Sequence, residues 1–224
     1  MVLVSDFDET LYDKNYKNNI MAVNNFVKKG NTFVIATGRS LKQLQKDLDE
    51  NLNFSYIICS NGSMIFDKYF NLIYRQNIGN EICHHIFDML KQSVYVGNPL
   101  VDLGYTTTKE NKSDVSSIQA RIIDMNGANI LKKEILKKYS NANASFSKSS
   151  IVFTDKNVSK GNSLKVLGKI IGEKPRRMYV IGDNLNDIEM CKIGIGIAME
   201  SGMDELKKVC KKVVKNVEEL IDII

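Results

Sequence analysis

Residues 1–13, with the sequence MVLVSDFDETLYD, decide the fold of this chain. Residues 2–4 are apolar and mostly β-branched, and a short run of this kind that ends at a polar cluster predicts a buried strand. Asp6 and Asp8 follow at once, and alternation along an extended chain places both on one side, with Phe7 on the other. Two carboxylates at the end of a buried strand repel each other and lose hydration, so we expect a cation to offset them. In open α/β sheets, this end of the strands is where ligands bind.

Two other interpretations of this stretch are a solvated acidic turn and a calcium-binding loop. Asp6, Asp8 and Thr10 occupy the first three alternate positions of an EF-hand loop. The sixth position, however, is Leu11 instead of Gly, and the twelfth is Lys17 instead of Glu. These two positions exclude the EF-hand, whereas the solvated turn stays open until the rest of the chain is considered.

The composition is that of an ordinary globular protein. The chain has 224 residues, of which 43% are hydrophobic and 25% charged, enough for a sizeable core in one large or two small domains. The net charge of +5 comes mainly from lysine pairs at helical spacing, with no aromatic residues between them. This pattern favours solvated helix faces over nucleic-acid binding and is compatible with a mild attraction for anionic substrates. We expect a monomer or a weak homodimer.

The cysteines and the apolar runs bear on the compartment. Cys59, Cys83, Cys191 and Cys210 lie far apart and form no paired metal spacing. Met1 leads straight into a predicted core strand, which argues against a signal peptide. No apolar run approaches the roughly 18 residues of a membrane span. We therefore expect a protein of the reducing cytoplasm that does not bind a membrane.

The opening part of the chain alternates between predicted strands and helices. Apolar runs predict further strands at 32–36 and 56–59, followed by a hairpin at 64–66 and 72–74. Helical periodicity predicts helices at 18–29 and 41–52. This alternation indicates a parallel sheet. Polar or glycine-containing residues follow three of the strands, at 6–8, 37–39 and 60–62, and three such ends together point to a single site.

The middle of the chain has a different pattern. Predicted strands come in groups between two helices, at 80–91 and 128–139, which is an α+β pattern with antiparallel pairing. The strands are expected at 94–96, 102–108, 118–123, 144–147 and 151–154. We interpret 77–153 as a separate inserted unit, and 1–76 together with 154–224 as the α/β core.

Strand and helix alternation resumes in the last part of the chain. A helix is expected at 159–172, with Ser159 as its N-cap, and a fourth core strand at 178–181 ends at Gly182 and Asp183. The remaining elements are helices at 187–192, 203–210 and 217–224 and strands at 193–198 and 212–214.

The polar residues at the strand and helix ends suit phosphate chemistry. The set consists of Asp6, Asp8, Thr37, Lys160, Asp183, Asn186 and Asp187. Carboxylate oxygens without histidine or thiol suit Mg²⁺, and Mg²⁺ in turn suits a phosphate. Thr37 and the Gly38 amide would donate hydrogen bonds to phosphate oxygens, and Lys160 would supply positive charge in the transition state. Asp6 is then the expected nucleophile, and Asp8 the expected acid and base.

These motifs resemble the haloacid dehalogenase (HAD) superfamily, in particular its Cof-type, sugar-phosphatase-like subgroup. The four motifs of that family are matched at 6–11 (DFDETL), 36–39 (ATGR), 158–161 (VSKG) and 182–187 (GDNLND). The Asn61-Gly62 pair also resembles a turn of the subgroup. The resemblance implies a Rossmann-like parallel-sheet core with an inserted α+β cap, and a small phosphorylated metabolite as substrate.

The resemblance also implies a role for each site residue. Asp6 and Asp8 would be catalytic, and Mg²⁺ would be held by Asp6, the Asp8 backbone carbonyl and Asp183, with Asp187 close by or acting through water. The residues expected on phosphate or substrate are Thr37, Gly38, Arg39, Asn61, Lys160 and Asn186. Glu9 departs from the glycine usual at its position, and the cap is short for the subgroup.

Two alternatives to a phosphatase stay open. A phosphomutase of the same superfamily would return the phosphoryl group to its substrate. A receiver-like signalling domain would be phosphorylated on an aspartate after the third strand. Because that strand is followed by Ser60, Asn61 and Gly62, with no aspartate, the sequence disfavours the receiver.

Overall fold

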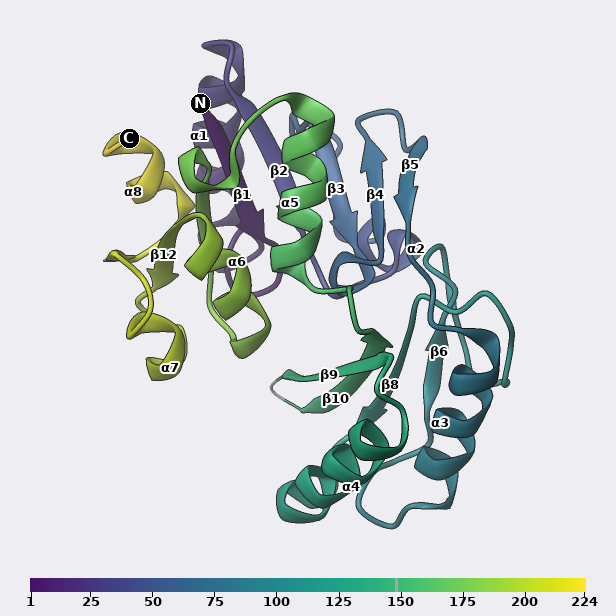
Figure 1. Ribbon diagram of the computed structural model, residues 1–224. Helices are drawn as coiled ribbons and strands as arrows, with labels where there is room; N and C mark the ends of the chain where they lie inside the picture. The colour runs from purple at the N-terminus through teal and green to yellow at the C-terminus, as the bar shows by residue number, and fades with distance from the viewer. Residues whose placement is uncertain (148) are drawn as a thin grey trace.

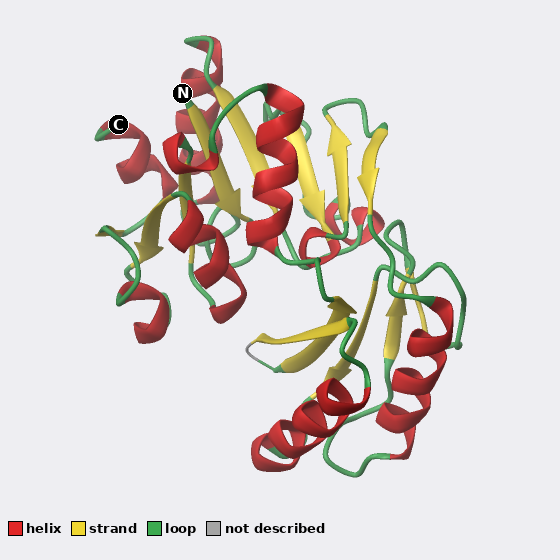
Figure 2. Cartoon of the chain, in the orientation of Figure 1, coloured by secondary structure: helices red, strands yellow, loops and turns green. Residues whose placement is uncertain are grey.

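The computed structural model describes residues 1–147 and 149–224. Its larger sheet has the order β13-β12-β11-β1-β2-β3-β4-β5 (Figures 1 and 2). Neighbouring strands pair in parallel from β13 to β3, and the hairpin of β4 and β5 continues the sheet in antiparallel fashion. The strands are β1 (Val2–Asp6), β2 (Thr32–Ala36), β3 (Tyr56–Cys59), β4 (Met64–Asp67), β5 (Leu72–Arg75), β11 (Tyr179–Gly182), β12 (Ile195–Met199) and β13 (Lys212–Val214).

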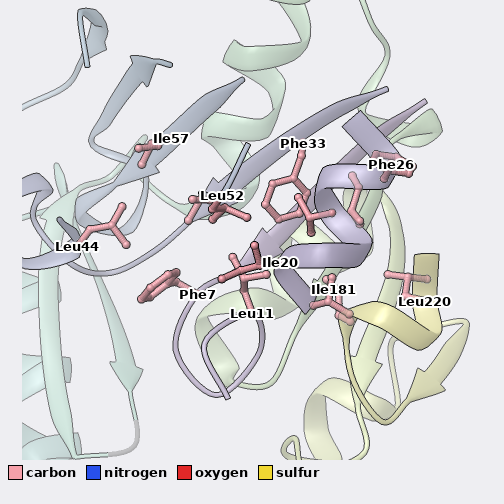
Figure 3. Close-up of a cluster of buried hydrophobic side chains, with 14 of the residues drawn as sticks. Phe7, Leu11, Ile20, Phe26, Phe33, Leu44, Leu52, Ile57, Ile181 and Leu220 are labelled. Atoms are coloured by element: carbon pink, nitrogen blue, oxygen red, sulfur yellow. The ribbon is translucent and has the colours of Figure 1, made fainter. Parts of the chain in front are cut away.

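Helices cover both faces of this sheet, which is why its central strands are continuous apolar runs. One face carries Leu3 and Phe33 in a core that includes residues of α1 (Tyr16–Lys28) and α8 (Val217–Asp222), and Figure 3 shows part of it. The other face carries Val4, in a core with residues of α5 and α6. The remaining helical segments are α2 (Leu41–Leu44), α5 (Lys160–Ile171), α6 (Ile188–Ile193), α7 (Asp204–Lys207), η1 (Ser60–Gly62), η2 (Pro175–Arg177) and η3 (Leu185–Asp187). The predicted α/β class is confirmed.

A smaller antiparallel sheet of order β7-β6-β8-β10-β9 forms the second part of the molecule. Figure 1 shows its two helices on the side away from the larger sheet, and their apolar residues share a core with its strands. The elements are β6 (Leu100–Asp102), β7 (Thr107–Thr108), β8 (Ser117–Arg121), β9 (Ala142–Ser147), β10 (Ser150–Asp155), α3 (Asn80–Gln92) and α4 (Met125–Lys138). The division of the chain at 76–77 and 153–154 stays a prediction, and β10 continues to Asp155.

Several predicted elements differ in the structure, and among them the helix expected at 203–210 covers only Asp204–Lys207. The helix expected at 41–52 ends at Leu44, and turns follow it: the Asp47 amide donates to the Leu44 carbonyl three residues back, and the Asp49 side chain accepts a hydrogen bond from the Asn51 amide. The strand expected at 102–108 is broken into β6 and β7 at Gly104, whose φ of +85° reverses the chain. The strand expected at 94–96 is reduced to one bridge, between Val96 and Ile122.

The two sheets meet through direct hydrogen bonds. The amides of Leu41 and Lys42, at the start of α2, donate to the carbonyls of Gly104 and Tyr105, each at 2.9 Å. Asp102, at the end of β6, is buried at this junction and accepts a hydrogen bond from the Gly104 amide at 2.6 Å. The loop of the smaller sheet is thereby fixed against the segment that follows β2.

Asp102 is expected to make stability depend on pH. Burial raises the pKa of its carboxyl to about 6, although hydrogen bonds such as that from the Gly104 amide oppose the shift. The folded state therefore holds this proton more tightly than the unfolded chain, so the free energy of unfolding falls as pH rises from about 4 to 6. A shift of this size corresponds to about 3 kcal/mol.

Urea unfolding of the wild type and of Asp102→Asn at several pH values measures this effect. The difference in unfolding free energy between the two proteins is expected to change across that window, whereas the exposed Asp88→Asn follows the wild type. Parallel curves for Asp102→Asn and the wild type would contradict the effect.

Candidate active site

The carboxyl ends of the central strands open into a cavity of about 560 Å³. In Figure 1 the arrowheads of β1 and β3 point toward the smaller sheet, which closes the far side with Gln119 and Val152. The other lining residues come from the larger part of the molecule and include Asp6, Asp8, Gly38, Arg39, Asn61, Asp183 and Asn186. The strand-end residues predicted from the sequence thus lie around one cavity.

A buried lysine joins two of the aspartates. Lys160 is the first residue of α5, which Ser159 caps by accepting a hydrogen bond from the Asn162 amide. This position carries the Lys160 side chain to the end of β1, where its Nζ lies 2.5 Å from Asp6 Oδ1 and 2.7 Å from Asp187 Oδ1. Because Lys160 is only 2% exposed, its charge is directed at these carboxylates instead of at solvent.

The electrostatics of this pair favour the charged lysine. Burial acts to lower the pKa of Lys160, but the carboxylates of Asp187 and Asp6 outweigh it and raise that pKa above its ordinary value. Burial also raises the pKa of Asp6 well above its ordinary value, against the attraction of the Lys160 ammonium. Asp6 therefore needs positive charge nearby to act as a carboxylate.

Three carboxylates form a group that fits a small divalent cation. One oxygen each of Asp6, Asp183 and Asp187 lies within 4.8 Å of the other two. The donors are all hard oxygen atoms, which is the ligand chemistry that Mg²⁺ prefers. The other Asp187 oxygen accepts hydrogen bonds from the amides of Asp183 and Asn184, at 3.1 and 3.0 Å. Asp187 is thus engaged on both oxygens. The other two carboxylates have partners as well, because Asp6 binds Lys160 and Asp183 accepts a hydrogen bond from the Thr10 hydroxyl at 3.4 Å.

The turn after β3 brings Asn61 to the wall of the cavity. Ser60 and Asn61 both have a positive φ, of 52° and 56°, and Gly62 follows with a φ of +107°. A Cβ on Gly62 would lie 2.5 Å from the Ser163 hydroxyl of α5, so only glycine allows the turn to pack on that helix. Asn61 in turn accepts a hydrogen bond from the Asn186 amide group at 3.2 Å.

The residues after β2 lie beside this turn. Thr37 is fully buried, and its carbonyl accepts a hydrogen bond from the Asn61 amide at 3.1 Å. A Cβ on Gly38 would lie 3.0 Å from the Asn61 side chain. The structure thus groups Thr37, Gly38, Asn61 and Asn186, four of the residues predicted to bind phosphate or substrate.

Asp8 and Arg39 occupy a different position from the buried cluster. The Arg39 guanidinium binds the Asp8 carboxylate through two nitrogens, and Asp8 does not belong to the three-carboxylate group. The Asp8 side chain is therefore held at the cavity wall, which leaves its backbone carbonyl as the expected metal donor. Three residues of this region were not predicted from the sequence. Asp47, which binds Arg39, lies in a segment wrongly predicted to be helical. Gln119 and Val152 reach the cavity only because of how the two sheets meet.

This arrangement, an α/β fold with aspartates and a lysine at the carboxyl ends of its central strands, defines a class of hydrolytic enzyme. A family model described as haloacid dehalogenase-like hydrolase matches residues 3–117 and 101–221. The chain belongs to this family, as the resemblance in its sequence predicted.

Individual relatives agree with this assignment. The 5-amino-6-(5-phospho-D-ribitylamino)uracil phosphatase YcsE of Bacillus subtilis is 26% identical over 207 residues, covering 90% of this chain and 81% of that protein. The phosphoglycolate phosphatase of Methanoculleus marisnigri is 28% identical over 203 residues, covering 89% and 83%. The structure of the HAD subclass IIB sugar phosphatase BT4131 matches with a TM-score of 0.77 at 20% identity, covering 97% and 94%. The predicted enzyme class, a HAD-type phosphatase, is confirmed.

Within residues 1–147 and 149–224, no helix combines the length and the apolar character that crossing a bilayer requires.

Proposed function

We propose that this enzyme is a Mg²⁺-dependent phosphatase that hydrolyses a small phosphorylated metabolite, a sugar phosphate in the first instance, through an aspartyl-phosphate on Asp6. The observation that carries the proposal is the buried Lys160 ammonium, 2.5 Å from an Asp6 oxygen at the end of β1. It supports Asp6 as a nucleophile because it favours the carboxylate form in a buried position.

The proposed reaction has two steps that use the same residues. In the first, an Asp6 oxygen attacks phosphorus, the ester P–O bond breaks, and the Asp8 carboxyl gives its proton to the leaving oxygen. In the second, water attacks phosphorus, Asp8 takes the proton of that water, and the electron pair of the breaking P–O bond returns to Asp6. Thr37, Gly38, Asn61 and Asn186 would orient the phosphoryl group by hydrogen bonds, and Lys160 would stabilise its charge.

A bound divalent cation would supply positive charge to the phosphoryl oxygens and reduce the repulsion between the buried carboxylates. Asp6 and Asp183 are its expected side-chain ligands, with the Asp8 backbone carbonyl. Asp187 would fix Lys160 and the loop after β11, since both of its oxygens already have partners.

Removal of divalent cations is expected to stop phosphate release and to lower stability. With EDTA the three carboxylates face each other with Lys160 as their nearby counter-charge, and Mg²⁺ at ten times its Kd should add about 1.4 kcal/mol to the free energy of unfolding. Thermal unfolding of the wild type and of Asp183→Asn, with EDTA and with Mg²⁺, measures this. Full activity in EDTA would contradict the metal dependence.

The substrate is expected to be small and polar. The cavity of about 560 Å³ is lined mainly by polar and charged residues, and Val152 is its aliphatic contribution from the smaller sheet. The two curated relatives are named for different phosphate esters, one on a ribityl chain and one on glycolate, so the leaving group varies among relatives of this chain.

Phosphate release from a panel of sugar phosphates, nucleotides and p-nitrophenyl phosphate tests the proposal. Mg²⁺-dependent release that is lost in EDTA is the expected result, and the rank order would define the leaving group. A folded protein that releases phosphate from none of these compounds would contradict the proposal. Transfer of an isotopically labelled phosphoryl group to a second position of the sugar would identify a phosphomutase instead.

A further inference from the structure

A chain of charged groups runs from the cavity wall to the segment after α2. Arg39 Nε lies 3.0 Å from Asp8 Oδ2, and its Nη2 lies 2.5 Å from Asp8 Oδ1. The third nitrogen, Nη1, lies 2.5 Å from Asp47 Oδ2 and 3.4 Å from the Gln43 carbonyl. Each guanidinium nitrogen thus has a partner, and the two carboxylates lie on different edges of one planar group.

Aromatic rings fix the plane of this guanidinium. The central carbon of Arg39 lies 5.1 Å from the centroid of the Phe7 ring and 5.9 Å from that of Tyr12. The Tyr16 ring packs edge-on against both of these rings, and its hydroxyl donates to the Asp47 carbonyl at 3.3 Å. The aromatic cluster of Phe7, Tyr12 and Tyr16 therefore packs against the Arg39 guanidinium and also binds the backbone of Asp47.

The ion pairs of Arg39 with Asp8 and Asp47 contribute little to the free energy of unfolding. The side chains of Asp8, Arg39 and Asp47 are 46%, 22% and 39% exposed, and partly exposed pairs contribute about 0–1 kcal/mol. Their geometry, a bidentate contact on one side and a second carboxylate on the other, instead limits the rotation of the Arg39 guanidinium. What this fixes is the direction of the Asp8 carboxylate at the cavity wall.

We propose that Asp47 is a positioning residue, which holds Arg39 so that the Asp8 side chain is directed at the water that hydrolyses the aspartyl-phosphate. This role rests on the proposed function. In that step the water oxygen bonds to phosphorus, its proton passes to Asp8, and the P–O bond to Asp6 breaks with its electron pair returning to Asp6. Contacts on both edges of the guanidinium hold the orientation of the Asp8 carboxylate, so Arg39 and Asp47 serve this step through geometry.

p-Nitrophenyl phosphate separates this step from the first one. Its leaving group departs without a proton, so kcat/KM, which reports transfer to Asp6, does not require Asp8. The steady-state kcat also includes the attack of water on the aspartyl-phosphate, and this step does require Asp8. Asp47→Asn is therefore expected to lower kcat about tenfold and KM in proportion, so that kcat/KM stays within about twofold of the wild-type value. A pre-steady-state burst of p-nitrophenolate, close to one per enzyme, is also expected.

Two control variants accompany this measurement. Glu50→Gln removes the same charge from an exposed position three residues further on, and it should behave as the wild type. Asp47→Glu keeps the carboxylate and should recover part of kcat.

Failure of the positioning role of Asp47 and failure of the phosphatase function give different results. A parallel loss of kcat and kcat/KM in Asp47→Asn, without a burst, would overturn the positioning role, as would no change in kcat. A wild type that releases no p-nitrophenolate under any metal condition would instead overturn the phosphatase function itself.

Discussion

Asp6→Asn is expected to abolish phosphate release while leaving the fold intact. The amide oxygen of asparagine is a poor nucleophile, and loss of a nucleophile that forms a covalent intermediate costs about 10⁴-fold or more in kcat. The fold should survive because Lys160 keeps Asp187 as a partner at 2.7 Å. Burial also disfavours the charged form of Asp6, so the neutral amide gives up an ion pair but also removes a desolvation cost.

The measurement is phosphate release by the variant and the wild type at equal concentration, together with their thermal unfolding. A change in the free energy of unfolding of about 1 kcal/mol or less is expected, since the two effects oppose each other. Normal turnover by Asp6→Asn would remove the aspartyl-phosphate from the mechanism.

Lys160→Met is expected to affect both activity and stability. Methionine fills a similar volume but leaves the carboxylates of Asp6 and Asp187 buried without their ammonium. Breaking a buried ion pair by removing one partner costs about 3–5 kcal/mol. Activity should fall at least about 10²-fold, because the phosphoryl group loses a charge that acts in the transition state.

Urea unfolding with EDTA and with Mg²⁺ separates the two effects. Mg²⁺ should restore part of the stability of Lys160→Met, since a cation among Asp6, Asp183 and Asp187 replaces some of the missing charge, but it should not restore activity. Lys165→Met, an exposed lysine on the same helix, serves as the matched control. Unchanged stability of Lys160→Met in EDTA would be incompatible with the buried ion pairs.

The core of the fold follows from local sequence patterns. The apolar runs at Val2–Asp6, Thr32–Ala36 and Tyr56–Cys59 are long enough for strands and too short for helices, and both of their faces are covered. Ser159 marks the start of the helix that carries Lys160. Because parallel strands bring their carboxyl ends to one edge, the sequence was enough to predict that Asp6 and Asp183 lie close together.

The contacts of Arg39 and Asp47 depend on interactions that local patterns do not carry. Leucine periodicity predicted a helix through Asp47, whereas the helix ends at Leu44 and the chain continues in turns, which include the Asx turn at Asp49 and its contact with Tyr16. The position of Gln119 on the cavity wall requires the smaller sheet to meet the larger one, and this is decided by pairs such as Leu41 with Gly104, far apart in the chain.

We expect the phosphoryl group to pass first to Asp6 and then to water. The measurement is the stereochemical course of the reaction at phosphorus. The best ester of the panel is made chiral at phosphorus with three oxygen isotopes, and the phosphoryl group is transferred to an alcohol acceptor so that the configuration of the product can be determined. Two in-line displacements each invert the configuration at phosphorus, so overall retention is expected. Inversion would show a single displacement by the acceptor, and would contradict Asp6 as the nucleophile.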